Sequence, residues 1–378
     1  MGKQTDLIEG NISKALLVFA VPLLIGNLFQ QLYNTADSYV VGNFVDTNAL
    51  AAVGASASVI QMLVGFFMGL SVGAGVVIAQ SFGAGQKEKM SQAVHSALAL
   101  TVLLSVLFTV AGIALTRPLL RAIGVPQEVL PHSTLYLTIY FAGITFLLFY
   151  NMGSGILRAI GNSRDPLIYL AVASVLNVIL DVLLVCVARL GVAGVALGTM
   201  IAQAVSAYLV MRQLIRTREA YRVELKKIRF HRDMIRQILM VGLPAALQQS
   251  ITAFSNVVVQ SYINSFGTAA IAGYSTTIRI DGFLQLVLQS FNMTITTFVG
   301  QNIGARKTER VKRGIFIAWL MCSVIILAGS VWMNREGALL VSLFTDDAAV
   351  VANGAAMLKL FSYAYWSLPV VQILSGAL

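Results

Sequence analysis

The chain has 378 residues and a formal net charge of +10; 57% of its residues are hydrophobic and only 11% are charged. Because soluble domains usually carry about 25% charged residues, this composition excludes an ordinary soluble protein and predicts an all-α integral membrane protein. The basic residues lie in short segments between apolar runs, which argues against nucleic acid as a partner and leaves membrane lipids as the expected surroundings.

The first predicted element is a membrane helix over residues 14–41, whose second half contains the polar sequence QQLYNTADSYVV. On a period of 3.6 residues its polar side chains share one stripe: Asn27, Gln30, Asn34 and Asp37, with Tyr33 one turn before Asp37. A carboxylate inside a bilayer-spanning helix is costly, so it normally faces a protein interior or a wet cavity on an ion or proton path. Asp37 is therefore the first candidate functional residue, and the alternative is an aspartate that caps a loop near the membrane surface.

Nine further apolar runs are long enough to cross a bilayer and do not alternate like strands, so all ten spans are predicted to be helices. They are expected near residues 51–80, 93–115, 132–157, 166–187, 192–214, 235–263, 269–298, 313–333 and 351–376. Pro22, Pro244 and Pro369 are expected to bend their helices. Gly65, Gly69 and Gly73 are spaced four apart, which predicts a face on which another helix packs closely.

Lysine and arginine are concentrated in every second connection between the predicted spans, which places those connections and both termini in the cytoplasm. The longest of these connections separates a six-helix lobe over residues 1–215 from a four-helix lobe over residues 234–378. We interpret residues 216–233 as a basic cytoplasmic linker; a binding site for lipid headgroups or a partner is the alternative. The cytoplasmic membrane of the cell is the expected location.

The second half of the chain repeats the first. VGLPAALQQ (241–249) is similar to FAVPLLIGN (19–27), and SGAL (375–378) is similar to SGIL (154–157), with an offset of 220 to 222 residues throughout. Both copies begin on the same side, so this is a parallel repeat of two pseudo-symmetric helix bundles, related by an axis along the membrane normal. In the first copy two further helices follow SGIL, so we expect ten transmembrane helices here of twelve in a complete version.

Four motifs resemble those of the multidrug and toxic compound extrusion (MATE) family. They are PxxxxNxxQQxYNTADSYVVG (22–42), QSFGAG (80–85), SGILRAIGNSRDP (154–166) and GQNIGA (300–305). The resemblance implies a secondary active multidrug exporter, which moves organic and mostly cationic compounds against protons or sodium. It further implies two lobes, a cavity that opens alternately to each side, no cofactor and a monomeric protein.

The resemblance to archaeal and DinF-like members implies a proton site in the first lobe. Its residues would be Tyr33 and Asp37 on the first helix, Asn177 and Asp181 on the fifth, and Thr199 on the sixth. Two carboxylates in a semi-dry site cannot comfortably both ionise, so one of them is expected to hold a proton. A sodium ion at Asp37 and Asp181 is an alternative, as is a purely structural hydrogen bond of Asn177 and Asp181 across helices.

The second lobe departs from the pattern of sodium-coupled members, which place acidic residues on the seventh and tenth helices. The seventh helix here has amides and no carboxylate, so a sodium site in this lobe is not expected. The candidates for lining a drug cavity are Gln30, Asn34, Gln248, Asn256, Arg279 and Asp281. Arg279 and Asp281 either line this cavity or form a structural ion pair, although i, i+2 spacing does not make them face each other.

Other classes of function fit the sequence poorly. The glycine-rich segments do not match the P-loop pattern GxxxxGK[ST], so transport driven by nucleotide hydrolysis is not indicated. The three histidines lack metal-ligand spacing and no nucleophile–base pair is evident, so neither a metal site nor an enzyme is expected. The main alternative is a lipid-linked oligosaccharide or lipid flippase of the same superfamily, for which a strongly cationic cavity is expected, whereas the interior charges here lean acidic. A channel would have no reason for a matched two-lobe repeat.

Overall fold

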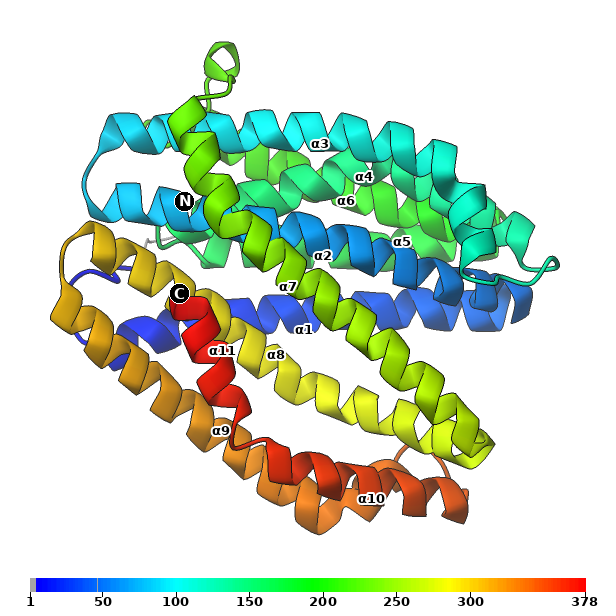
Figure 1. The fold of residues 1–378 in the computed structure, drawn as a ribbon. Helices are drawn as coiled ribbons and strands as arrows, with labels where there is room; N and C mark the ends of the chain where they lie inside the picture. The colour runs from blue at the N-terminus through cyan, green and yellow to red at the C-terminus, as the bar shows by residue number, and fades with distance from the viewer. Residues whose placement is uncertain (1–4, 46) are drawn as a thin grey trace. The chain divides into compact units, whose positions relative to one another are not determined.

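In the computed structural model, residues 5–45 and 47–378 are described, except for the side chains at 34, 38, 43, 47, 48, 50, 58, 254, 257, 264, 268 and 269. Regular secondary structure in this part of the chain is helical throughout (Figure 1). The helices are α1 (Ile12–Phe44), α2 (Thr47–Gly83), α3 (Lys87–Ala122), α4 (Leu130–Ala159), α5 (Arg164–Asp181), α6 (Val192–Arg216), α7 (Arg232–Ile263), α8 (Thr268–Gly304), α9 (Thr308–Ser342), α10 (Ala348–Ala364) and α11 (Leu368–Ala377). A π-helical turn, Val182–Val187, continues α5.

Of the described helices, α1 to α7 and α9 are long and apolar enough to cross a membrane, and α10 and α11 are shorter apolar helices. The predicted all-α membrane architecture is therefore confirmed. The tenth span, predicted as one helix over 351–376, is wrong in one respect, because the chain breaks between Tyr365 and Ser367. Pro369 lies in the first turn of α11, where its missing N–H costs nothing, whereas within a continuous helix it would remove a hydrogen bond.

The chain forms two compact units, each described here by itself. One contains residues 25–250 and the other contains residues 5–24 and 251–378, so the division falls inside α1 and inside α7. Within the first unit, α4 is the central helix and packs against α2, α3 and α6. Its fully buried Phe141, Ile144 and Leu148 belong to the main apolar core of that unit. The lobe boundaries at 215 and 234 stay a prediction.

The first half of α7 crosses α2 within the first unit, at a contact made by small residues. A Cβ atom at Gly69 would collide with the backbone of Ala246, and one at Gly73 would collide with the backbone of Gly242. Lipid tails are as apolar as leucine, so helices in a membrane associate largely through such close backbone packing. The prediction that this glycine stripe packs against another helix is confirmed.

In the second unit, α8 packs against α9, α10 and α11. The segment that precedes α1 also belongs to this unit, and the side chain of Leu7 is fully buried. Arg310 donates from its two Nη atoms to the carbonyls of Glu9 and Gly10, both at 2.8 Å. Asn302 donates to the carbonyl of Leu7 at 3.0 Å, so residues 7–10 are held on the turn between α8 and α9.

Candidate functional site

Asp37 lies inside α1, not at its end, and only 7% of the residue is exposed. The residues that follow it, Val40 and Val41, are buried in a small apolar cluster with Tyr136 of α4 and Val195 of α6. This packing holds the second half of α1 against the other helices of the first unit. The interpretation of Asp37 as a cap in a surface loop is therefore wrong.

Three further predicted residues meet the Asp37 carboxylate. Thr199 on α6 donates from Oγ1 to Asp37 Oδ2 at 3.3 Å. Asn177 and Asp181 on α5 face the same carboxylate, and they are 1% and 0% exposed. The structure thus brings together side chains that are up to 162 residues apart in sequence.

Most polar atoms of this cluster have no hydrogen-bond partner within the described part of the chain. They are Oδ1 of Asp37, both carboxylate oxygens of Asp181, and Oδ1 and Nδ2 of Asn177. Each buried polar group left unsatisfied costs about 1–3 kcal/mol, and more if it is charged. Among the described residues neither carboxylate forms an ion pair with a basic side chain, so a proton, a water molecule or a small cation is needed to satisfy them.

Gly198 makes room for this arrangement on α6. A Cβ atom at that position would lie 2.6 Å from Asp181 Oδ1, which is closer than non-bonded atoms approach. The end of α5 can therefore pack on α6 with its carboxylate in between. A purely structural role of Asn177 and Asp181 across helices stays an alternative, since both residues of α5 face the Asp37 carboxylate of α1.

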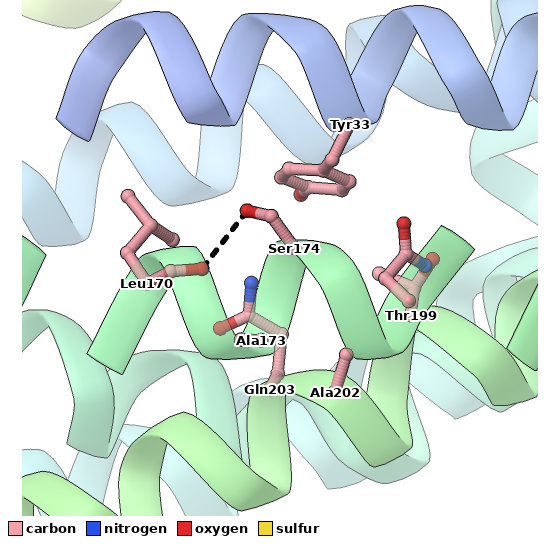
Figure 2. A pocket seen from close by; sticks show the side chains of 8 residues that line it. Tyr33, Leu170, Ala173, Ser174, Thr199, Ala202 and Gln203 are labelled. Atoms are coloured by element: carbon pink, nitrogen blue, oxygen red, sulfur yellow. Dashed lines mark hydrogen bonds between the residues drawn. The ribbon is translucent and has the colours of Figure 1, made fainter. Parts of the chain in front are cut away.

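Tyr33 joins the cluster through a small cavity next to the carboxylates (Figure 2). The cavity has a volume of about 10 Å³, and its lining is Tyr33, Leu170, Ala173, Ser174, Asn177, Thr199, Ala202 and Gln203. This is room for about one water molecule. In Figure 2, Tyr33 lies across the cavity from α5 and α6, where Ser174 donates to the carbonyl of Leu170 at 2.9 Å.

Two residues at this site were not among the predicted ones. Gln203 is 4% exposed and faces the Tyr33 hydroxyl, and Tyr136 of α4 is 6% exposed and lies near Asp37 and Tyr33. Gln203 follows Thr199 at i+4, so the sequence placed it on the same helix face. No comparable signal marks Tyr136, because an aromatic residue in an apolar helix is usually part of the packing.

The predicted drug-cavity residues are not brought together into one described site. Gln30 and Gln248 are exposed residues of the first unit, and Asn256 and Arg279 are exposed residues of the second. The side chain of Asn34 lies outside the described residues. Asp281 is half-buried and accepts hydrogen bonds from Tyr365 and Gln285. Among the described residues no ion pair joins Arg279 to Asp281, so that structural alternative is wrong, and a cavity lined by these residues stays a prediction.

Comparison with known proteins gives the family. The profile of the MatE family matches residues 22–183 and again 244–378. This chain belongs to the MatE family. The two matched stretches begin at Pro22 and Pro244, which confirms the parallel repeat. MatE proteins are membrane transporters, so the chain is a multi-pass membrane protein of a non-enzymatic class.

Individual relatives agree with this assignment. The chain is 30% identical over 374 residues to the probable multidrug resistance protein YpnP of Bacillus subtilis, covering 99% of this chain and 84% of that protein. It is 25% identical over 348 residues to the multidrug export protein MepA of Staphylococcus aureus, covering 92% of this chain and 77% of that protein.

Solved structures show the same fold. A MATE family transporter of the MOP superfamily in an outward-facing conformation superposes with a TM-score of 0.92 at 25% identity, covering 100% of this chain and 84% of that one. A MOP superfamily transporter from Pyrococcus furiosus superposes with a TM-score of 0.91 at 24% identity, and the superposition covers 100% of this chain and 85% of that one. The latter likeness concerns the fold alone.

Proposed function

We propose that this MatE protein is a multidrug exporter that exchanges organic cations for protons by alternating access. Relatives named for multidrug resistance and multidrug export support the substrate class. The observation that carries the coupling is the buried pair Asp37 and Asp181, which has unpaired oxygens and no basic partner among the described residues. Such a pair gains stability when one carboxylate takes up a proton.

Coupling requires that proton and drug prefer different states of the transporter. Protonation of Asp37 removes one charge from the buried cluster, so the repulsion between the two carboxylates ends. The hydrogen bond from Thr199 and the contacts of Val40 and Val41 tie Asp37 to the rest of the first unit. The change of charge therefore alters how the second half of α1 packs, and Pro22 lets the two halves of α1 move separately. A cationic drug loses its attraction to the site when the proton is bound.

Sodium is the second candidate for the coupling ion. The oxygens of Asp37, Asn177, Asp181 and Thr199 face one another and are hard ligands of the kind that sodium accepts. The proton is favoured because the described cavity is small and lined partly by Leu170, Ala173 and Ala202, which offer a metal ion no ligands. Both ions use the same carboxylates, so the experiment must vary the two gradients separately.

The test is transport by the purified full-length chain in liposomes. An imposed proton gradient is expected to drive accumulation of a cationic dye and to collapse as the dye enters. Asp37→Asn should abolish both signals, since the amide keeps the shape but cannot bind and release a proton. Asp165→Asn is the matched control: Asp165 is also buried, but Asn162 and Gln213 already satisfy it at 2.8 and 2.5 Å. Undiminished coupling in Asp37→Asn, or transport driven by sodium alone, would contradict the proposal.

A further inference from the structure

A second carboxylate with neutral partners, the half-buried Asp281, lies in the second unit at the break between α10 and α11. Tyr365 is the first residue after α10, is 1% exposed, and donates its hydroxyl proton to Oδ1 of Asp281 on α8. Gln285, one turn further along α8, donates to Oδ2 at 3.4 Å. Both oxygens of Asp281 are therefore held by neutral donors.

This arrangement is absent from the first copy of the repeat. With the offset of 221 residues between SGIL and SGAL, Tyr365 corresponds to Ile144, which is fully buried in the apolar core. The corresponding helix of the first copy, α4, runs unbroken from Leu130 to Ala159. The second copy thus has a broken helix and a tyrosine where the first has a continuous helix and an aliphatic residue, so the fold of the repeat does not require the pair.

Polar groups of α9 support the end of α10. Ser330 donates to the carbonyl of Ser362 at 2.8 Å, and Asn334 donates to the hydroxyl of Ser362 at 2.8 Å. These bonds lie one turn before Tyr365 and satisfy groups near the break. Transporters commonly build ion sites at discontinuous helices, because backbone and side-chain groups there are free to respond to a bound ion.

The surroundings of Asp281 contain no countercharge among the described residues. Arg279 on the same helix is exposed, and so are Arg335 and Glu336 on α9 and Lys359 on α10. None of them forms an ion pair with Asp281. The titratable groups that face it are Tyr365 from the break and Tyr274, two turns earlier on α8. A half-buried carboxylate with only neutral partners is less stable in its charged form than one in water, which is the property required of a proton carrier.

We infer that Asp281, Tyr365 and Gln285 form a second proton-binding site in the second unit. Water supplies the proton to the Asp281 carboxylate, and the same group returns it to water, so no other reactant is needed. Protonation weakens the bond that Tyr365 donates, because a neutral carboxyl is a poorer acceptor than a carboxylate. The protonation state of Asp281 is thereby linked to the position of the α10–α11 junction. This inference rests on the proposed function, since proton coupling gives the second site its role.

The test is infrared difference spectroscopy of the purified full-length protein between alkaline and acidic buffer, without sodium. A carboxylic acid C=O band is expected to appear on acidification, to be lost in Asp281→Asn, and to change its midpoint pH in Tyr365→Phe. The band of Asp281 should persist in Asp37→Asn. Asp165→Asn is the control, because it removes an aspartate whose carboxylate already accepts hydrogen bonds from Asn162 and Gln213, and the band should persist there as well. If the hydrogen bond between Tyr365 and Asp281 were only structural, Asp281→Asn and Tyr365→Phe would both lower thermal stability, but the carboxylic acid band would be the same as in the wild type.

The second readout is the number of protons released when a cationic dye binds in weakly buffered solution. The number should fall by about one in Asp281→Asn. Identical bands and equal proton release in wild type and Asp281→Asn would overturn the second site while leaving the Asp37 proposal intact. A fall of about one proton in Asp37→Asn, with the Asp281 band and its share of the release retained, supports both. A proton release that is unchanged in Asp37→Asn contradicts the proposed function separately.

Discussion

The Thr199 hydroxyl of α6 donates a hydrogen bond of 3.3 Å to the Asp37 carboxylate of α1. The other carboxylate oxygen, Oδ1, has no hydrogen-bond partner among the described residues. The bond fixes one oxygen of Asp37 and leaves the other free to bind a proton. Hence Thr199 sets the orientation of the carboxylate that the proposed coupling depends on.

Replacing Thr199 with valine, which has nearly the same shape, should separate orientation from packing. A hydrogen bond to a charged group contributes about 1.5–3 kcal/mol, so proton-driven export should fall by about tenfold or more. Thr199→Ser keeps the hydroxyl, so its rate of proton-driven export should stay close to that of the wild type. The measurement is the initial rate of dye uptake in liposomes at matched protein density. Equal rates in the valine and serine variants would show that the hydroxyl has no part in coupling.

The contact between α2 and α7 predicts a large difference between two glycines of α2. Gly69→Ala places a Cβ against the backbone of Ala246, and overpacking of this kind costs about 1–3 kcal/mol. Gly75 has open space around it, so Gly75→Ala should be neutral or slightly stabilising because alanine favours helix. Thermal unfolding in detergent measures both. If Gly69→Ala unfolds at the wild-type temperature, the close contact of α2 and α7 is wrong.

The connection before α7 predicts a dependence of stability on pH. His95 accepts a hydrogen bond at Nε2 from the backbone N–H of Glu224 at 3.0 Å, and His231 bonds to Ser96 at 3.1 Å. Burial, together with Arg229 and His95, lowers the pKa of His231 below its usual value.

The sign of this pH dependence follows from where the protons bind. The unfolded chain takes up a proton on His231 near pH 6.5, before the folded protein does. Stability is therefore fully present above that pH and is lost as the pH falls toward the folded pKa. Thermal unfolding between pH 8 and about 5.5 should show this loss, and His231→Asn should reduce it. An equal pH dependence in the variant would contradict the assignment.

The anchor of the first residues predicts protease sensitivity. Arg310 holds the carbonyls of Leu7, Glu9 and Gly10 with three nitrogens, and its guanidinium lies over the Phe298 ring at 5.7 Å. Arg310→Lys keeps the charge but not the forked geometry, so cleavage before α1 should be faster. Lys312→Ala, which loses only an exposed pair with Glu309, is the control. Equal cleavage of all three proteins would show that this anchor is not needed.

The helices and the repeat could be predicted from sequence because each leaves a local pattern, whereas the set of Tyr33, Asp37, Asn177, Asp181 and Thr199 was expected from the family resemblance. Asp37 stands out as a charge within an apolar run, and Thr199 shares a helix face with other polar residues. The bond between Tyr365 and Asp281 joins residues 84 apart, and nothing in either local sequence indicates it. Pro369 indicated the break between α10 and α11 only in part, because a proline is compatible with a bend within one helix as well as with the start of a new helix. The division of the chain inside α1 and α7 depends on packing between helices, which periodicity does not record.

The most direct test of the account is the affinity of the full-length protein for a cationic dye in detergent, measured between pH 5 and 8 with and without sodium. Proton and dye are expected to compete, so affinity should fall as the pH drops, irrespective of sodium, and the fall should vanish in Asp37→Asn. Affinity that does not change with pH but depends on sodium, or an Asp37→Asn variant with the wild-type pH dependence, would contradict proton coupling at Asp37 and Asp181.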